Sequence, residues 1–554
     1  MKPDGSKNIF SLKNRIIRLK RDSSRWSILS LAIVFFIALP VFAIAVNLLW
    51  GPGETWGHIV NYLLPGYISN SLYLILLCTV MTLLFGVTTS WLVSRYDFPF
   101  RPQLEWLLIL PLAIPSYITA YAYAGVFDFG GTFMQAMQWL DLQPIRIDVM
   151  NRLGLAFVLS ISLFPYVYVS SKTFFSSEAN NLLEASKMLG TSEWRSFFKL
   201  ILPLSRPAIV AGLILILMEV LNDYGAATYY GVSTFTTGIF RSWFSLEEPE
   251  TAIYLSAILL FIVFGLLLLE KWQRRNKQFV SNKTSNRYIH RRKVSKSGQI
   301  LLLFLVSFPV IIGFFVPLGQ LLYWSYFTFD NVFDSSFLSL SIQSLWVALL
   351  TALITVLVAT ALIFAAKWNR IQFIKSLSKL SILGYAIPGA VVAIGVMLPT
   401  LTVDKWLVDF LYSQSGIRTG FLINGTLMAL VYAYVVRFLA VAYNPIESAG
   451  LKVSNSIPDA SRTLGIGNLK TFFKIEFPLI KTGLLGAFIL VFIDVMKELP
   501  LTLILKPYHF NTLAVKAYEY ASDERIMEAA VPSLFIILTA MIPVIFLNKL
   551  IRKR

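Results

Sequence analysis

The stretch EASKMLGTSEWRSFFKLILP, residues 184–203, returns 275 residues later as DASRTLGIGNLKTFFKIEFP, residues 459–478. We call these two stretches bracket 1 and bracket 2. Both lie between long apolar runs, and both place a glycine thirteen residues before a proline. A polar, aromatic-tipped segment that recurs with this spacing indicates a duplicated functional element, and it sets the frame in which the rest of the chain is interpreted.

The composition is typical of a polytopic membrane protein. Of the 554 residues, 56% are hydrophobic and only 14% are charged, whereas soluble domains carry about 25% charged residues. The net charge of +18 comes from bases in short loops between apolar runs, which indicates membrane orientation and no nucleic-acid partner. Cys78 is the single cysteine and lies in an apolar run, so we expect a small buried side chain without a disulfide.

Twelve apolar runs approach or exceed the length of about 20 residues that a bilayer-spanning helix needs. They cover 27–49, 71–94, 104–126, 153–175, 207–229, 251–269, 300–324, 342–366, 377–400, 421–443, 482–506 and 530–548. Residues 1–26 hold eight Lys and Arg and residues 270–299 hold ten, whereas 50–70 hold none. The positive-inside rule therefore predicts both termini and both brackets in the cytoplasm.

The repeat extends over the whole chain. EVLNDYG at 219–225 aligns with DVMKELP at 494–500 at the same shift of 275, and AIPS at 113–116 aligns with AIPG at 386–389 at a shift of 273. Each copy has six spans, an even number, so both copies enter the membrane in the same direction as a parallel repeat. The predicted domains are a cytoplasmic tail 1–26, a six-helix half 27–269, a cytoplasmic linker 270–299 and a second six-helix half 300–554.

Each bracket is predicted to fold as two short helices around a turn. Gly190 and Gly465 can adopt the left-handed conformation that ends a helix. Thr191 or Ser192 can then cap the second helix of bracket 1, and Asn468 that of bracket 2. The second helices carry apolar and aromatic side chains, which would be presented on the cytoplasmic side.

Two uses of such brackets are open. An amphipathic helix can lie in the groove of a partner protein, and two brackets would suit a two-fold partner. Alternatively, the brackets are interfacial helices that rest on lipid headgroups. The repeated glycine-to-proline spacing favours the docking interpretation, because a helix lying on the membrane does not require a fixed glycine.

At this point the chain resembles the membrane subunits of bacterial binding-protein-dependent ABC importers. Their pattern is Glu-Ala-Ala, three residues, Gly and a later Ile/Leu-x-x-Pro, and both brackets follow it with two mild changes: the third residue is Ser in each copy, and bracket 2 begins with Asp. In that family the segment is the coupling helix that fits a groove on the ATPase subunit. The resemblance assigns ATPase coupling to Glu184, Ala185, Gly190, Phe197, Phe198, Pro203, Asp459, Ala460, Gly465, Phe472, Phe473 and Pro478.

The fused twelve-span layout resembles the ferric-iron permease branch, through residues 219–244 and 494–520. Fused thiamine and aminoethylphosphonate permeases are relatives, so those substrates stay open. The resemblance implies two ATPase subunits that carry ATP and magnesium on the cytoplasmic face, an extracytoplasmic substrate-binding protein and a place in the bacterial inner membrane. The sequence has no G-x-x-x-x-G-K-[ST] phosphate loop, so we expect a transport subunit that binds no cofactor and is not itself an enzyme.

Four carboxylates within the spans are candidates for the translocation path. Glu219 and Asp223 stand four residues apart, and Asp494 and Glu498 occupy the matching positions of the second copy. Charges at membrane depth are costly and usually face a cavity or a partner, and oxygen ligands suit a hard cation. The structural alternative is that neighbouring helices, or Lys497, neutralise them.

Two other function classes are alternatives to the importer. A proton-coupled secondary transporter can also have parallel halves, with Glu219 or Asp494 as proton relays, but it has no ATPase for the brackets to dock. A membrane-embedded enzyme would need a nucleophile or metal constellation. The histidines His58, His290 and His509 lie outside the spans without metal-ligand spacing, so no metal site is expected.

Overall fold

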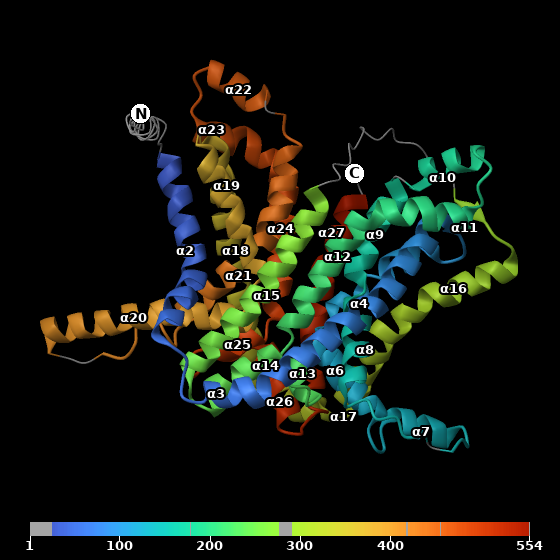
Figure 1. Ribbon diagram of the computed structural model, residues 1–554, viewed down its shortest axis with the longest axis horizontal. Coiled ribbons are helices and arrows are strands. Elements are labelled where there is room, and N and C mark those ends of the chain that lie inside the picture. The colour runs from blue at the N-terminus through green and yellow to red at the C-terminus, as the bar shows by residue number, and fades with distance from the viewer. Residues whose placement is uncertain are drawn as a thin grey trace, which may run out of the picture. The chain divides into compact units, whose positions relative to one another are not determined.

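The computed structural model describes residues 25–143, 145–177, 179–275, 291–369, 371–416, 419–454 and 456–552. Most of the predicted tail 1–26 and half of the predicted linker 270–299 lie outside these residues. Helices make up most of the described chain (Figure 1). The strands within it are β1 (Tyr96–Asp97) and β2 (Arg292–Lys293), which pair in parallel. The predicted all-α fold is confirmed.

The chain divides into two packed units. The larger unit, Trp50–Ser341 with Thr512–Met541, is called unit A, and the unit of Met1–Leu49, Ile342–Asn511 and Ile542–Arg554 is called unit B. Unit A holds α3 (Trp56–His58), η2 (Ile59–Leu63), α4 (Leu64–Arg95), α5 (Arg101–Leu107), η3 (Leu110–Ala113), α6 (Ser116–Phe127), α7 (Thr132–Trp139), α8 (Arg152–Leu163), α9 (Pro165–Ser177), α10 (Ala179–Met188), α11 (Glu193–Ser196), η4 (Phe197–Ile201), α12 (Leu202–Asn222), α13 (Gly225–Tyr229), α14 (Phe235–Phe240), η5 (Arg241–Ser245), α15 (Pro249–Arg275), α16 (Lys296–Val310), η6 (Ile311–Phe315), α17 (Val316–Val332) and α26 (Leu513–Ser522).

The helices of the second packed unit are fewer. Unit B holds α2 (Arg25–Asn47), α19 (Gln372–Leu380), η7 (Ser381–Ala386), α20 (Gly389–Ser415), α21 (Leu427–Leu451), α22 (Ser456–Thr463), α23 (Asn468–Thr471), η8 (Phe472–Glu476), α24 (Phe477–Met496) and α25 (Pro500–Leu505). Three elements cross from one unit to the other: η1 (Leu48–Trp50), α18 (Ser335–Trp368) and α27 (Ala530–Arg552). In unit B, α20 runs across the direction of α18 and α21 (Figure 1).

The described residues contain nine helices that are long and apolar enough to cross a membrane, and eleven when two bent pairs are each counted as one span. The pair formed by 101–113 and 116–139 is bent by 93°, and the pair of α8 and α9 is bent by 42°. Twelve spans were predicted. The twelfth, 530–548, falls in α27, whose apolar stretch Ala530–Ile542 is shorter than the other spans.

A proline break recurs in both repeats and corrects two predicted spans. Pro115 and Pro388 precede α6 and α20 with ψ angles of 142° and 144°, which is extended backbone. Proline lacks the N–H that a continuing helix needs, so the helix restarts after it. The predicted span 104–126 is therefore broken at Pro115, and the predicted span 377–400 is replaced by a helix that begins only at Gly389.

Close helix packing in unit A depends on a small residue. The helices α4, α9 and α12 pack on one another, and a Cβ at Gly212 would lie 2.8 Å from the carbonyl oxygen of Tyr166. Small residues allow this approach between membrane helices, whose association relies on van der Waals contact.

The packed units do not coincide with the sequence repeats. In unit A, Tyr123 donates to the carbonyl of Ile312 at 2.6 Å, and Thr132 donates to Gln320 at 2.6 Å, so the start of the second repeat packs with the first. In unit B, the first helix α2 packs on α20, and the rings of Trp26 and Trp368 lie 4.5 Å apart. The halves 27–269 and 300–554 therefore describe the repeat in the sequence, while each packed unit draws helices from both.

Cys78 offers a test of the fold of unit A. Its side chain is fully buried in α4, and its Sγ lies 3.5 Å from the carbonyl oxygen of Ala156 in α8. A thiol reagent reaches such a group only through local opening. We expect maleimide to label the folded wild-type protein at least about tenfold more slowly than the Leu189→Cys variant, whose position is exposed. Equal labelling rates in mild detergent would contradict the packing of α4 on α8.

Candidate functional site

Both brackets turn at their glycines as predicted. Gly190 and Gly465 have φ angles of +75° and +73°, in the left-handed region that glycine adopts at low cost. In each bracket the N–H after the glycine donates to a carbonyl at the end of the first helix, that of Ser186 at 3.1 Å and that of Ser461 at 3.0 Å. The two turns therefore have the same backbone geometry, 275 residues apart.

The start of the second helix differs in part from the prediction. The residues preceding α11 and α23 are Ser192 and Gly467, and neither makes a side-chain capping bond. Asn468 is the first residue inside α23, so its predicted capping role is wrong. The helices are held by hydroxyl pairs, Thr191 with Ser196 at 2.9 Å in bracket 1 and Ser461 with Thr471 at 2.6 Å in bracket 2.

Each bracket ends in a π-helical turn, η4 or η8. The first phenylalanine of each turn is buried, with Phe197 and Phe472 9% and 8% exposed, whereas Phe198 and Phe473 are 58% and 63% exposed. The expectation that both phenylalanines of each pair are presented outward is therefore wrong for Phe197 and Phe472. Consecutive helical residues project about 100° apart, so one side chain of a pair faces the protein when the other faces out.

The buried phenylalanines anchor the brackets to long helices. The ring of Phe197 lies 4.6 Å from that of Trp91 in α4. The ring of Phe472 lies 4.5 Å from that of Phe364 in α18, and Trp91 and Phe364 are themselves equivalent at the shift of 273. Such aromatic pairs add about 0.5–1.5 kcal/mol beyond burial of apolar area. Each bracket is thus fixed to one long apolar helix of its own unit.

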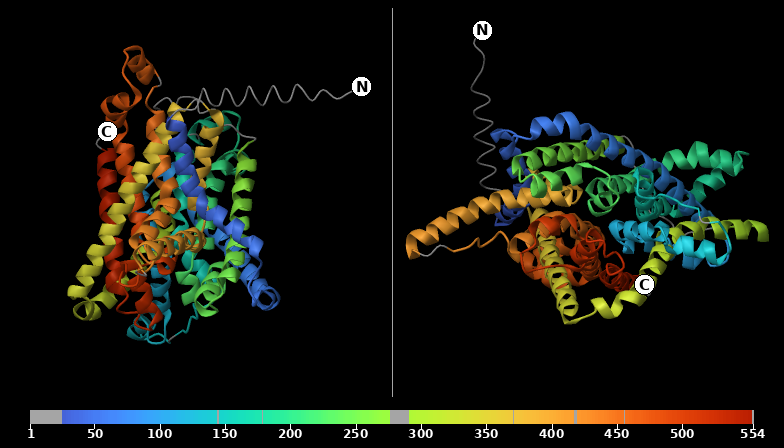
Figure 2. Two further views of the ribbon diagram at one scale, coloured as in Figure 1. Left: turned by 90° about the vertical axis from the view of Figure 1, so that its left-hand side faces the viewer. Right: turned by 90° about the horizontal axis from the view of Figure 1, so that it is seen from below.

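The outward faces of the two brackets present apolar side chains at the same three positions. Those side chains are exposed in both copies, and α22 and α23 project from one end of unit B (Figure 2). The six residues are Leu189, Trp194 and Phe198 in bracket 1 and Leu464, Leu469 and Phe473 in bracket 2.

The remaining predicted coupling residues lie at the bracket ends. Glu184, Asp459, Ala460 and Pro478 are exposed and Pro203 is half-buried, while the side chain of Ala185 lies outside the described ones.

Bracket 1 carries an ion-pair junction that sequence reasoning missed. Glu193 at the start of α11 pairs with Arg95 at 2.6 Å and with Arg292 at 2.9 Å. Arg95 ends α4, and Arg292 belongs to β2 beside it, so the strand after the linker is tied to bracket 1. The equivalent of Glu193 in bracket 2 is Asn468. No local sequence pattern marks this junction, because its three members come from distant parts of the chain.

Two of the predicted path carboxylates hold helix breaks. Asp223 Oδ1 accepts from the backbone N–H groups of Ala226 at 3.0 Å and Ala227 at 3.1 Å, at the start of α13. Glu498 Oε1 accepts from the N–H of Leu501 at 3.1 Å, at the start of α25. Asp223 and Glu498 are equivalent at the shift of 275, and both are buried. Each therefore satisfies the first N–H groups of a short helix after a break in a long one.

The second carboxylate oxygen has a different partner in each repeat. Asp223 Oδ2 accepts from the hydroxyl of Ser116 at 2.6 Å, directly after the Pro115 break. Glu498 instead pairs with Arg437 at 3.3 Å, and the residue equivalent to Ser116 is Gly389, where a Cβ would lie 2.6 Å from Glu498 Oε1.

Arg437 is correspondingly buried in the middle of α21 and donates to the carbonyl of Ile387 at 3.1 Å. Position 437 is near the end of the predicted span 421–443, but it is near the middle of the helix that the structure shows. The helix runs from Leu427 to Leu451, well past the predicted 421–443.

The other two carboxylates are half-buried. Asp494 pairs with Lys497 at 2.9 Å, the partner that the structural alternative named. Glu219 lies in the last turn of α12, four residues before Asp223, which follows the end of the helix. No group of three or more His, Cys, Asp and Glu side chains suited to a metal ion occurs in the part of the chain that the structure describes.

A family model described as "Binding-protein-dependent transport system inner membrane component" matches residues 83–275 and again residues 363–554. This chain belongs to that family. The two matches cover the two sequence repeats, so the predicted tandem permease architecture is confirmed.

Three relatives of this permease illustrate how far the similarity reaches. The Fe(3+)-transport system permease protein FbpB 2 of Haemophilus influenzae is 28% identical over 491 residues, which are 87% of this chain and 89% of the relative. The sulfate transport system permease protein CysT of Escherichia coli is 27% identical over 36% of this chain and 71% of its own. The spermidine/putrescine transport system permease protein PotB of Haemophilus influenzae is 28% identical over 36% of this chain and 74% of its own.

The Arg437–Glu498 pair yields a stability prediction for the permease. Arg437→Met leaves the buried Glu498 without its cation, which costs about 3–5 kcal/mol when a buried pair is broken. We expect a clear fall in the thermal unfolding temperature in detergent. The double variant Arg437→Met with Glu498→Gln should recover part of this loss, because no charge is then left buried.

A matched control is Arg525→Met, which breaks the exposed pair of Arg525 and Glu528 and should leave the unfolding temperature almost unchanged. Equal losses in the single and double variants would contradict the stabilising role of the buried pair.

Proposed function

We propose that this permease is the transmembrane subunit of an ATP-driven ABC importer that carries ferric iron inward. The observation that carries the proposal is the similarity to the Fe(3+)-transport permease, which runs through 87% of this chain and therefore through both repeats. The sulfate and polyamine permeases match 36% of the chain each, about one repeat. A substrate-binding protein on the outer side would deliver the cargo, in keeping with the family description.

The energy for transport would come from two ATPase subunits bound to the two brackets. The exposed apolar side chains at equivalent positions of the two brackets support this role; Trp194 and Leu469 are one such pair. So does the anchoring of Phe197 and Phe472 to α4 and α18, because a displaced bracket would then move a long helix with it. ATP and magnesium would be held by the partner subunits.

Movement at a bracket has a direct structural route into the membrane. The π turn of each bracket continues without interruption into α12 or α24. α12 has 21 residues, about 31 Å at 1.5 Å per residue, and it ends at the break held by Asp223. Rigid helices between a bracket and a break would convert ATPase closure into alternating access.

The predicted orientation and path belong to the same proposal. Both termini and both brackets would face the cytoplasm, in the inner membrane of a bacterium. All four path carboxylates, Glu219, Asp223, Asp494 and Glu498, stay candidates for cargo contact. Asp223 and Glu498 also hold helix breaks, and Asp494 also pairs with Lys497.

The docking role of the brackets can be tested with surface variants that leave the fold intact. We expect Phe198→Ser combined with Phe473→Ser to insert normally and to unfold at the wild-type temperature, while retaining at least about tenfold less ATPase on co-purification, since exposed aromatic anchors dominate such interfaces. Trp406→Ser, an exposed aromatic of α20 outside the brackets, is the matched control and should capture the ATPase normally. Undiminished ATPase capture by the double variant would refute the docking role.

The cargo can be tested by uptake into cells or vesicles that contain the complete importer. Radiolabelled ferric iron should accumulate in an ATP-dependent manner, and excess unlabelled ferric iron should compete. Thiamine, aminoethylphosphonate, sulfate and spermidine should not compete. A site whose oxygen ligands are arranged for a hard trivalent cation does not bind these compounds. Competition by one of these four compounds, with no effect of iron, would reassign the cargo while leaving the importer mechanism in place.

A further inference from the structure

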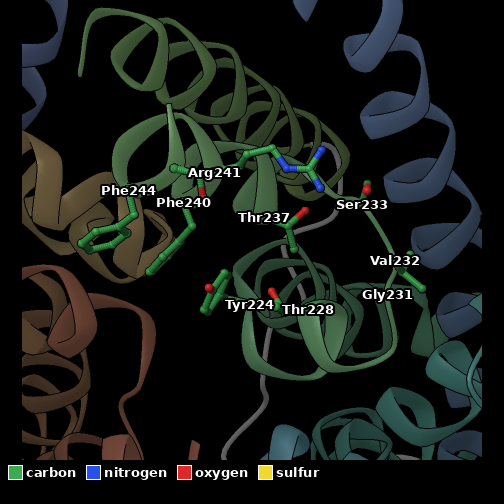
Figure 3. Close-up of a pocket in the computed structure, with 10 residues that line it drawn as sticks. Tyr224, Thr228, Gly231, Val232, Ser233, Thr237, Phe240, Arg241 and Phe244 are labelled. Carbon is green, nitrogen blue, oxygen red and sulfur yellow. The ribbon is translucent and has the colours of Figure 1, made fainter. Parts of the chain in front are cut away.

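A polar cavity of about 250 Å³ lies in unit A at the end of α12 remote from bracket 1, between α13, α14 and η5 (Figure 3). Its lining combines one guanidinium with several hydroxyl groups. The polar side chains are Arg241, Tyr224, Thr228, Ser233, Thr237 and Ser245. The carboxylates of the proposed path are not among the lining residues, so the cavity presents a net positive charge.

Arg241 is positioned by local structure. It is the first residue of the π turn η5, directly after α14, and α14 begins with a capping box between Thr234 and Thr237. The guanidinium extends past Thr237 toward Ser233 (Figure 3). Within the described residues, Arg241 forms an ion pair with no carboxylate. Its guanidinium is hydrogen-bonded to the hydroxyl of Tyr67. The guanidinium therefore retains hydrogen-bonding capacity for a ligand.

The cavity adjoins the break at the end of α12. Tyr224 follows Asp223 directly, its ring is stacked on that of Phe240 at 3.7 Å, and its hydroxyl lies 3.2 Å from that of Tyr518 in α26. Tyr224 therefore joins the wall of the cavity to the helix break at Asp223, and Glu219 lies four residues before that break. A ligand bound there would sit beside the outer end of the proposed path.

The second repeat holds the equivalent base in a different way. At the shift of 275, which also matches Thr237 with Thr512, the residue equivalent to Arg241 is Lys516. Lys516 lies 3.8 Å from the carboxylate of Glu519, whereas Arg241 has no such carboxylate partner among the described residues.

We propose that the Arg241 cavity binds a small inorganic oxyanion of the phosphate, sulfate or bicarbonate class. Guanidinium and hydroxyl groups donate to oxyanions in the geometry such ligands favour. A bare trivalent cation would be repelled by the guanidinium. The source of the oxyanion rests on the proposed function: it is either free in the medium or the oxygen ligand that accompanies ferric iron.

The test measures binding to the purified full-length permease in detergent, using phosphate, sulfate and bicarbonate as probes. At least one probe should raise the thermal unfolding temperature of the wild type in a saturable manner. Arg241→Gln should weaken that anion at least about tenfold, since a charge-assisted bond is lost. Thr228→Val, which removes one hydroxyl, should weaken binding less, and Arg241→Lys should retain part of it.

The matched control is Arg146→Gln, which removes an exposed arginine of the loop between α7 and α8 and should bind as the wild type does. A second arm adds ferric iron to each probe. A response to the anion alone identifies a free anion, and a response only with iron identifies the ligand of the cargo; both support the site. No saturable shift in either arm, or equal shifts in wild type and Arg241→Gln, would overturn the proposal. Failure of the anion site would leave the proposed function standing, because ATPase capture and iron uptake test that function separately.

Discussion

The buried carboxylate at each helix break is the interaction on which the architecture depends. A helix that restarts at membrane depth has N–H groups in its first turn that water cannot satisfy. Asp223 accepts two of them at the start of α13, and Glu498 accepts one at the start of α25. Each carboxylate is also held by a residue on a second element, Ser116 or Arg437. Without these acceptors, unsatisfied N–H groups would make the helix breaks energetically costly. The proposed route from bracket to path ends at these breaks and therefore depends on them.

The two repeats keep one backbone plan and diverge in side-chain chemistry. At the breaks, the neutral hydroxyl of Ser116 donates to Asp223, whereas the guanidinium of Arg437 pairs with Glu498. An ion pair in the second repeat therefore takes the place of a hydrogen bond in the first. Beyond the breaks, Arg241 forms an ion pair with no carboxylate among the described residues, whereas its equivalent at the shift of 275, Lys516, lies 3.8 Å from Glu519. The brackets, by contrast, present apolar groups at equivalent positions. This distribution fits the proposed function, in which the brackets would meet two like ATPase subunits.

Much of this could be predicted from sequence, because the signals are local. Hydropathy predicted the helical membrane class, and the shift of 275 revealed the repeat. The glycines of the brackets predicted turns, and their φ angles in the structure are +75° and +73°. The carboxylates were also found as candidates, since charges in apolar runs stand out. Their partners were not, because Ser116 lies 107 residues from Asp223 and nothing near either residue marks the contact. The central position of Arg437 in its helix was not predicted for a different reason: the helix extends beyond the apolar run that marked the span.

The sequence by itself determined the membrane class, the tandem repeat, the two brackets and their turning residues, since backbone preference and hydropathy act over a few residues. Only the tertiary structure decided that Phe197 and Phe472 face inward, that α2 packs with helices of the second repeat, and that Arg241 shares a cavity with five hydroxyl-bearing residues. These features depend on which surfaces meet after folding. A side chain's neighbours are set by the packing of distant segments, and no short window of sequence contains that information.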